Sequence, residues 1–273
     1  VDIHLKGAGK TPYSRFGDGR AVLRSVIREY LCGEAMHALS IPTSRALMII
    51  GSDEMVLREK SETAAMLART AKTHVRFGNF EYFHYNNKPE YVKVLADFCI
   101  DNYPAYFSRT KNKYEEFFRS VVKQTACMIA QWQASGFNHG VMNTDNMTIT
   151  GTTFDYGPYG FIDGFNPSYT PNSSDTHGRY AYQQQAEIGF WNLNKLAETL
   201  IPLVGSDQLQ EEIKQYQPIF NGLYREEMGR KLGISILDAE FSQLTKEMFQ
   251  LLIKYQFDYS NFFRLLANYP DQI

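Results

Sequence analysis

The stretch at residues 138–163 constrains the chain most strongly, because it places side chains suited to a metal–nucleotide complex on two short loops. Asp145 and Asn146 are adjacent in the first loop, and Asp155 follows in the second, after a strand-like segment at 147–150. A metal ion bound to a nucleoside triphosphate takes oxygen ligands, of which the protein supplies one or two. Asn146 and Asp155 suit that task, and Asp145 is the acid placed to accept a proton from an attacking hydroxyl. Because Asp–Asn is also a common turn pair, a plain turn remains an alternative.

The order of these residues resembles the catalytic core of a protein kinase with one part missing. Kinases carry the motif H-R-D-L-x-x-x-N, in which the Asp is the catalytic base and the Asn binds magnesium. His139 and Asn146 have that separation, but Val141 stands at the position of the base. Asp155 opens a D-Y-G sequence, which has the form of the D-F-G metal motif. The predicted metal ligands are therefore present, and the kinase base is absent.

Two residues near the start of the chain extend this pattern. Kinases pair a lysine on a strand with a glutamate on the following helix, so that the lysine can hold phosphates. Lys6 ends an alternating, strand-like segment at residues 1–6, and Glu29 lies among apolar positions of a helix predicted for residues 19–39. Either residue alone is typical of a solvated surface, but together with the two metal ligands they complete the kinase order.

Several other polar residues keep more than one interpretation at this point. Arg69 and Arg76 suit phosphate, because guanidinium donors form a rigid fork, but ordinary surface arginines would give the same sequence. Asp18 can cap the helix predicted after it. His139 is expected to be structural, holding the backbone of its loop.

The hydrophobic pattern predicts an α+β fold of two lobes, similar to that of a protein kinase. Residues 1–86 form a small, mostly β lobe with one long helix, and residues 87–273 form a larger helical lobe that carries the catalytic and metal-binding loops. A long loop without helical period, at 164–182, is expected to border a substrate site. In the small lobe the predicted strands are 1–6, 45–50 and 55–58, with a turn at 51–54. In the helical lobe the predicted helices are 89–103, 111–135, 184–203, 207–232 and 237–255.

Composition and charge are those of an ordinary globular protein. Apolar residues make up 44% of the 273 residues, charged residues make up 21%, and the net charge is −2. This balance argues against nucleic acid or an anionic membrane as a partner, and no apolar run reaches the roughly 18–20 residues of a membrane helix. The cysteines at 32, 99 and 127 have no paired spacing, so we expect a reducing compartment, without disulfides or structural zinc.

Taken together, six segments closely resemble the selenoprotein O family, and the match runs from Val1 to beyond Trp191. They are LKGAGKTPYSR (5–15), DGRAVLRS (18–25), HVRFGNFEYF (74–83), GVMNTDNMTITG (140–151), DYGPYGFID (155–163) and GRYAY (178–182). The resemblance implies a pseudokinase, a protein-kinase-like fold without the usual catalytic Asp. It also implies transfer of AMP from ATP to hydroxyl groups of proteins, with the nucleotide bound in the reverse of the kinase orientation.

The resemblance also implies a role for each matching residue. Asp145 would be the base that activates a Ser, Thr or Tyr hydroxyl of a target protein. Magnesium, or manganese in its place, would be held by Asn146 and Asp155. The phosphates of ATP would be bound by Lys6, Arg69 and Arg76, with Glu29 positioning Lys6. Asp18, Gly19 and Asp155 would line the nucleotide site, and the functions of Asp18 and of the two arginines follow from the family alone.

The resemblance leaves two departures and two rival functions. The family carries a glycine-rich nucleotide loop upstream of Lys6 and a longer C-terminus, so we expect this sequence to be a fragment of a longer protein. One rival is a protein kinase that uses Asp145 as a displaced base, and the other is an inactive nucleotide-binding scaffold. Use of UTP with manganese stays open. The expected compartment is the cytoplasm for a bacterial protein and the mitochondrion for a eukaryotic one.

Overall fold

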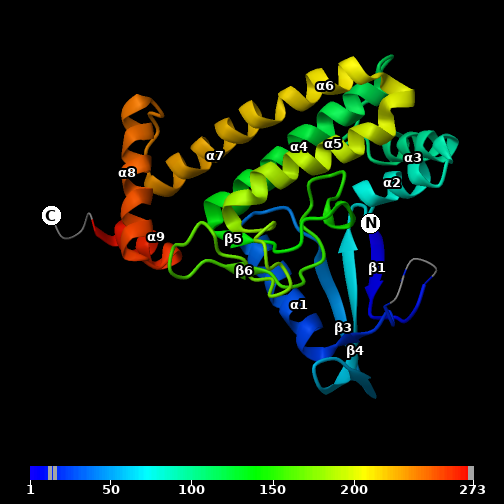
Figure 1. Ribbon diagram of the computed structural model, residues 1–273, viewed down its shortest axis with the longest axis horizontal. Helices are drawn as coiled ribbons and strands as arrows, with labels where there is room; N and C mark the ends of the chain where they lie inside the picture. Colours follow the sequence, from blue (N-terminus) through cyan, green and yellow to red (C-terminus); the bar gives the residue numbers. More distant parts are fainter. Residues whose placement is uncertain (12–13, 15–16, 270–273) are drawn as a thin grey trace.

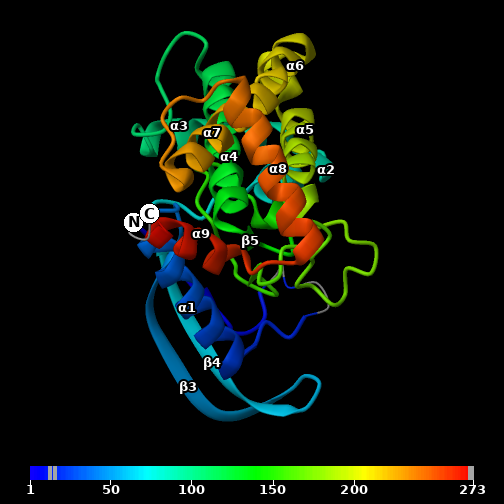
Figure 2. The same cartoon turned by 90° about the vertical axis from the view of Figure 1, so that its left-hand side faces the viewer.

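The computed structural model describes residues 1–11, 14 and 17–269. An antiparallel sheet and one helix lie at one end of the molecule, and the remaining helices lie at the other (Figures 1 and 2). We call residues 1–71 the sheet region and residues 77–269 the helical region. The α+β class predicted from the hydrophobic pattern is therefore confirmed. Parts of the 5–15 motif, at positions 12, 13 and 15, fall outside the described residues.

The sheet is organised around β4 (Ser61–Ala71), which pairs on one side with β3 (Arg45–Leu57). On its other side β4 pairs with β1 (Asp2–Lys6) and with β2 (Ala21–Val22). Helix α1 (Leu23–Ala38) covers one face of this sheet and buries Val26 against Ala21, Ala65 and Leu67. All these pairings are antiparallel, so neighbouring strands place their side chains opposite one another on the same face.

The helical region is built around α4 (Lys113–Ser135), whose buried stripe includes Phe117, Val121, Ile129 and Trp132. The helices that surround it are α2 (Phe77–Tyr85), α3 (Pro89–Asn102), α5 (Gln185–Val204), α6 (Ser206–Lys214) and α7 (Tyr216–Leu232). Two further helices, α8 (Ala239–Tyr255) and α9 (Tyr259–Asn268), form a second core with the end of α4. Among the described ranges, no helix has both the length and the apolar character needed to cross a membrane.

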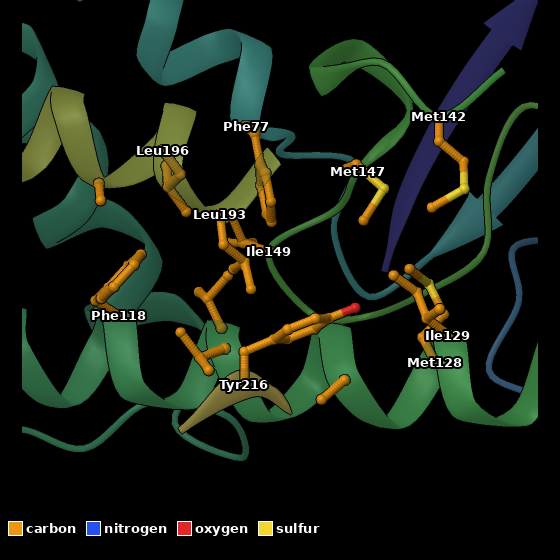
Figure 3. Close-up of a cluster of buried hydrophobic side chains, with 14 of the residues drawn as sticks. Phe77, Phe118, Met128, Ile129, Met142, Met147, Ile149, Leu193, Leu196 and Tyr216 are labelled. Atoms are coloured by element: carbon orange, nitrogen blue, oxygen red, sulfur yellow. The ribbon is translucent and has the colours of Figure 1, made fainter. Parts of the chain in front are cut away.

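The segment between Asp145 and Asp155 is anchored in the main helical core. Met142, Met147 and Ile149 are fully buried and lie among Phe77, Phe118, Leu193 and Tyr216 (Figure 3). Apolar and polar residues alternate along this stretch, and buried side chains of both kinds, including Thr148 and Thr150, fix the loop. The short helix η1 (Thr144–Asn146) and the paired strands β5 (Phe137–Asn138) and β6 (Gly160–Phe161) complete it.

Several predicted elements need correction. The first helix begins at Leu23 rather than residue 19, because Ala21 and Val22 pair with β4. The two strands predicted at 45–50 and 55–58 are one strand, β3, which passes through the supposed turn with a register irregularity. The helix predicted at 207–232 is divided at Gln215 into α6 and α7. Strand β4 and helix α9 were not predicted.

Candidate functional site

Four predicted site residues come together where α1 and the loop after Ile149 meet the end of the sheet. The register of β1 and β4 places His4 opposite Arg69, and Lys6 lies two residues further along β1 on the same face. Helix α1 covers that face and brings Glu29 to it. Asp155 arrives from the helical region, so the cluster joins residues from four separate segments.

The four side chains form one ion-pair network. Lys6 Nζ lies 2.6 Å from Glu29 Oε2 and 2.8 Å from Asp155 Oδ1. Arg69 Nη1 lies 2.8 Å from Glu29 Oε1 and 3.0 Å from the same Asp155 Oδ1. Each carboxylate therefore contacts both cations. The Glu29 and Arg69 side chains are 3% and 4% exposed, whereas Lys6 is 23% and Asp155 is 33% exposed, so solvent reaches the network from the side of Lys6 and Asp155.

The network stabilises the charged form of Asp155. Burial opposes ionisation of this carboxyl, but the charges of Lys6 and Arg69 outweigh burial and hold its pKa well below the usual range. For Lys6, burial likewise disfavours the charge, and Asp155 and Glu29 together raise its pKa above the ordinary value. Both groups are ionised near neutral pH, as binding of phosphates and a cation requires.

The backbone at Asp155 is held in an unusual conformation. Its φ is +60°, in the left-handed region that non-glycine residues rarely adopt. The preceding residue is fixed from both sides, because Phe154 is buried and its carbonyl oxygen lies 2.9 Å from His139 Nε2. His139 is itself fully buried and stacks on Trp132, so the structural role predicted for His139 is confirmed. Backbone strain that the surroundings maintain is a common property of functional sites.

The two candidate phosphate-binding arginines share one aromatic platform. The guanidinium carbon of Arg69 lies 4.3 Å from the centre of the Phe154 ring, and that of Arg76 lies 4.9 Å from it. Arg76 Nη1 also donates a hydrogen bond to the Asp145 carbonyl oxygen, at 3.1 Å. Burial lowers the pKa of Arg76 somewhat. The Phe154 ring thus holds two guanidinium groups beside the ion-pair network.

Asp145 and Asn146 lie on η1, next to the start of α2. A Cβ atom added to Gly78 would lie 2.1 Å from Asp145 Oδ1, so the absence of a side chain at Gly78 makes room for this carboxylate. Asn146 Nδ2 donates to the Val141 carbonyl oxygen at 2.9 Å. This bond commits the amide nitrogen and leaves the amide oxygen as the atom suited to a cation.

The side chains present fit a magnesium ion bound together with phosphates. Magnesium prefers carboxylate and carbonyl oxygens and usually keeps ligands from water and phosphate. Asn146 offers an oriented amide oxygen, and Asp155 offers a carboxylate that stays ionised. Within the described part of the chain, no group of three or more His, Cys, Asp or Glu side chains gathers to hold a metal. Asn146 and Asp155 are the residues that would hold such an ion.

Asp18 and Gly19 lie outside the ion-pair network. Asp18 pairs with Arg58, with 2.8 Å between Oδ2 and Nη1, and its Oδ1 accepts a hydrogen bond from the Arg20 amide. It does not cap α1, whose first turn has no side-chain cap, so that expectation was wrong. Gly19 has a φ of +68° and packs directly on Gly9, whose amide donates to the Gly19 carbonyl oxygen. These two residues shape the loop beyond Lys6, and their role in nucleotide binding stays a prediction.

Sequence reasoning missed three residues that shape the site. His4 Nδ1 lies 3.0 Å from Arg69 Nη2, and burial lowers the pKa of His4 to about 3, so its neutral ring accepts this hydrogen bond. The Phe154 ring packs against the guanidinium groups of both arginines, and the missing side chain of Gly78 leaves room for the Asp145 carboxylate. A signal existed for two of them, since His4 is two residues before Lys6 on the same strand and Phe154 directly precedes Asp155. Nothing in the sequence indicates the proximity of Gly78.

Comparison with known proteins identifies similar sequences over the full chain. The sequence model of a family described as "Protein adenylyltransferase SelO" matches residues 1–273. A curated protein from Myxococcus xanthus (strain DK1622), named "Protein nucleotidyltransferase YdiU", is 51% identical over 268 residues. That alignment covers 98% of this chain and 55% of the relative, so the chain spans about half the length of the curated protein that it matches.

Proposed function

Because this chain belongs to the SelO family, we propose that the protein is a protein adenylyltransferase, which transfers AMP from ATP to hydroxyl groups of target proteins. The observation that carries the proposal is the network of Lys6, Glu29, Arg69 and Asp155. It gathers two cations and an ionised, partly exposed carboxylate from four segments. A triphosphate with its metal ion needs that combination of charges.

We further propose that the fold is protein-kinase-like, with the nucleotide reversed relative to a kinase. The Lys6–Glu29 pair between a strand and the next helix, and the Asp155 loop reaching it from the helical region, support this arrangement. Val141 occupies the kinase base position and has no acid to offer. The division into lobes at residues 1–86 and 87–273 remains a prediction. Helix α2 packs with the helical region through Phe77 and Phe80, so it would move with the larger lobe.

In the proposed reaction, Asp145 accepts the proton of a Ser, Thr or Tyr hydroxyl of the target protein. The hydroxyl oxygen forms a bond to the α-phosphorus of ATP, and the bond from that phosphorus to the bridging oxygen breaks, releasing pyrophosphate. Lys6, Arg69 and Arg76 neutralise the leaving phosphates. Asn146 and Asp155 would hold magnesium, which supplies charge stabilisation at the α-phosphoryl group.

The test compares two labels. We would incubate the longest available form of the protein with magnesium and ATP. The ATP is labelled at either the α- or the γ-phosphate. Protein labelled only from the α-phosphate is the expected result. Labelling only from the γ-phosphate would make the protein a kinase with a displaced base. If neither label is transferred while ATP still binds in calorimetry, the protein is a nucleotide-binding scaffold.

Variants then test the residue assignments. Asp145→Ala should abolish label transfer and leave ATP affinity nearly unchanged, because this residue is assigned to the acceptor hydroxyl rather than to the nucleotide. Asp155→Ala should abolish both transfer and magnesium-dependent ATP binding. Asp207→Ala, at an exposed position of α6, is the matched control. Full metal-dependent transfer by Asp155→Ala would refute the metal assignment, and full transfer by Asp145→Ala would place the base elsewhere.

A further inference from the structure

A cleft of about 600 Å³ opens beside the ion-pair network, between the first half of α1 and the loop that follows Asp155. Its cationic lining residues are Lys6, Arg20, Arg24, Arg28 and Arg58. None of the described residues that line it is acidic. In a chain with a net charge of −2, this is a marked local concentration of positive charge.

The acids that pair with these arginines lie outside the lining. Arg20 pairs with Glu54, and Arg24 Nε lies 2.7 Å from Glu62 Oε2. Arg58 pairs with Asp18. Each of these ion pairs has at least one exposed partner, and ion pairs at the surface are weak. An anion entering the cleft could therefore compete for the same guanidinium groups.

Arg28 differs from the other three arginines. Its Nη2 donates to the Tyr159 carbonyl oxygen at 3.0 Å, and its guanidinium carbon lies 4.7 Å from the centre of the Tyr159 ring. In return, the Tyr159 hydroxyl donates to the Arg28 carbonyl oxygen. No acidic side chain of the described residues pairs with Arg28. The guanidinium is thus held in place across the cleft, and its charge has no counter-ion within the described ranges of the chain.

The position of the cleft connects it to the proposed reaction. Lys6 lines it and contacts Asp155. Tyr156 and Gly157, which directly follow Asp155, form part of its wall. Tyr169 and Pro171 line it from the long loop that was expected to border a substrate site. A chain segment bound here would lie next to the centre where the acceptor must be presented.

We propose that this cleft binds an acidic segment of the protein that accepts the nucleotide, with Arg28 as its main anchor. The inference rests on the proposed function, because the acceptor of that reaction is a protein. Charge complementarity selects acidic side chains, and carboxylates match the guanidinium fork. A cleft of this volume accommodates a few side chains of an extended segment, and the tyrosine and proline residues provide apolar contact for its backbone.

The test measures binding without requiring transfer. A fluorescein-labelled peptide of ten glutamates is titrated with the protein, and anisotropy is recorded with magnesium and saturating α,β-methylene-ATP, which keeps the nucleotide site filled. Arg28→Ala should weaken peptide binding about tenfold, as expected for loss of a charge-assisted contact. Arg28→Lys should retain part of the affinity. The matched control is Arg109→Ala, which removes an exposed, paired arginine from the helical region, and a labelled ten-lysine peptide should not bind.

A variant that binds the peptide more tightly cannot be explained by misfolding, which would only weaken binding. Glu62→Gln removes the carboxylate that holds Arg24 and should strengthen peptide binding about threefold. Unchanged affinity in both Arg28→Ala and Glu62→Gln would overturn the proposal. The proposal would also be overturned if the nucleotide displaced the peptide and Arg28→Ala weakened ATP binding as much as peptide binding. In that case the cleft would hold the nucleotide. If label transfer fails but peptide binding depends on Arg28, the transferase proposal is wrong, whereas the proposal that the cleft binds an acidic segment is supported.

Discussion

At the scale of single residues, Glu29 has the most demanding position, because one buried carboxylate balances two cations. Glu29→Gln would keep the shape of the side chain but leave Lys6 and Arg69 with a single shared carboxylate. Breaking a buried ion pair on one side costs about 3 kcal/mol or more. We expect a loss of about that size in the free energy of unfolding, measured in urea.

The same helix offers the control for this prediction. Glu34 pairs with Arg45 at the surface, where the side chains are 36% and 40% exposed. Such a pair contributes about 1 kcal/mol at most, so Glu34→Gln should have little effect. Equal losses in the two variants would mean that burial of the network does not govern its contribution.

Histidine titration gives a second prediction at this scale. Burial, followed by the charge of Arg69, lowers the pKa of His74 to about 4, whereas an unfolded histidine has a pKa of about 6.5. As the pH falls below about 6.5, the unfolded chain takes up a proton that the folded chain does not, so stability decreases down to about pH 4. His74→Phe should reduce this dependence by up to about 1.4 kcal/mol per pH unit. An unchanged slope of unfolding free energy against pH in His74→Phe would contradict this prediction.

At the scale of elements, close helix packing depends on particular glycines. A Cβ atom on Gly189 of α5 would lie 2.3 Å from Ile129 Cδ1 and 2.5 Å from the Tyr216 hydroxyl oxygen. Gly189→Ala must therefore displace these two buried side chains or move α5, and should cost about 1–3 kcal/mol of unfolding free energy. A Cβ on Gly222 of α7 would meet nothing within 4 Å. Gly222→Ala should instead stabilise the protein by about 0.5–1 kcal/mol, and thermal or urea unfolding distinguishes the two signs.

The predicted elements are those whose conformation follows from their own sequence, and the missed ones depend on pairing with distant segments. Helix α4 was predictable, because its apolar stripe repeats over the whole of Lys113–Ser135. Strand β4 was not, because the run Thr63–Ala71 is rich in alanine and its strand conformation follows from pairing on both sides. The predicted turn at Gly51–Glu54 failed for a related reason, since pairing with β4 carries the strand through it.

The same difference holds for the site: some of its residues follow from their order along the chain, and others from contacts made only in the folded structure. The pairing of Lys6 with Glu29 and the presence of Asp155 beside them were predictable from the order of these residues, whereas the role of Asn146 stays a prediction. The partnership of Arg69 with both carboxylates depends on the register of β1 against β4, and the contact of Asp145 with Gly78 depends on tertiary packing. Neither is recorded in the spacing of residues along the chain.

At the scale of the whole molecule, the network ties the sheet region to the helical region. A ligand that binds Lys6 and Asp155 together should therefore stabilise the entire fold. At a hundredfold excess over its dissociation constant, ATP with magnesium should add about 2.7 kcal/mol to the unfolding free energy, which is measurable as a rise in melting temperature. Arg69→Ala should remove the rise, and Arg230→Ala, at a surface position of α7, should retain it. A rise that persists in Arg69→Ala would place the nucleotide elsewhere.

Lys6 and Arg69 both hold one atom, Asp155 Oδ1. Before any phosphate arrives, the protein's own carboxylate occupies the two cations as an internal competitor. If the nucleotide binds as proposed, its entry would be an exchange of anions rather than the filling of a vacant site, and the free energy of binding would be reduced by that of the contacts given up. A cation that took over Asp155 would release Lys6 and Arg69 for the phosphates. The affinities for metal and nucleotide would thereby be linked, and each should be weak in the absence of the other.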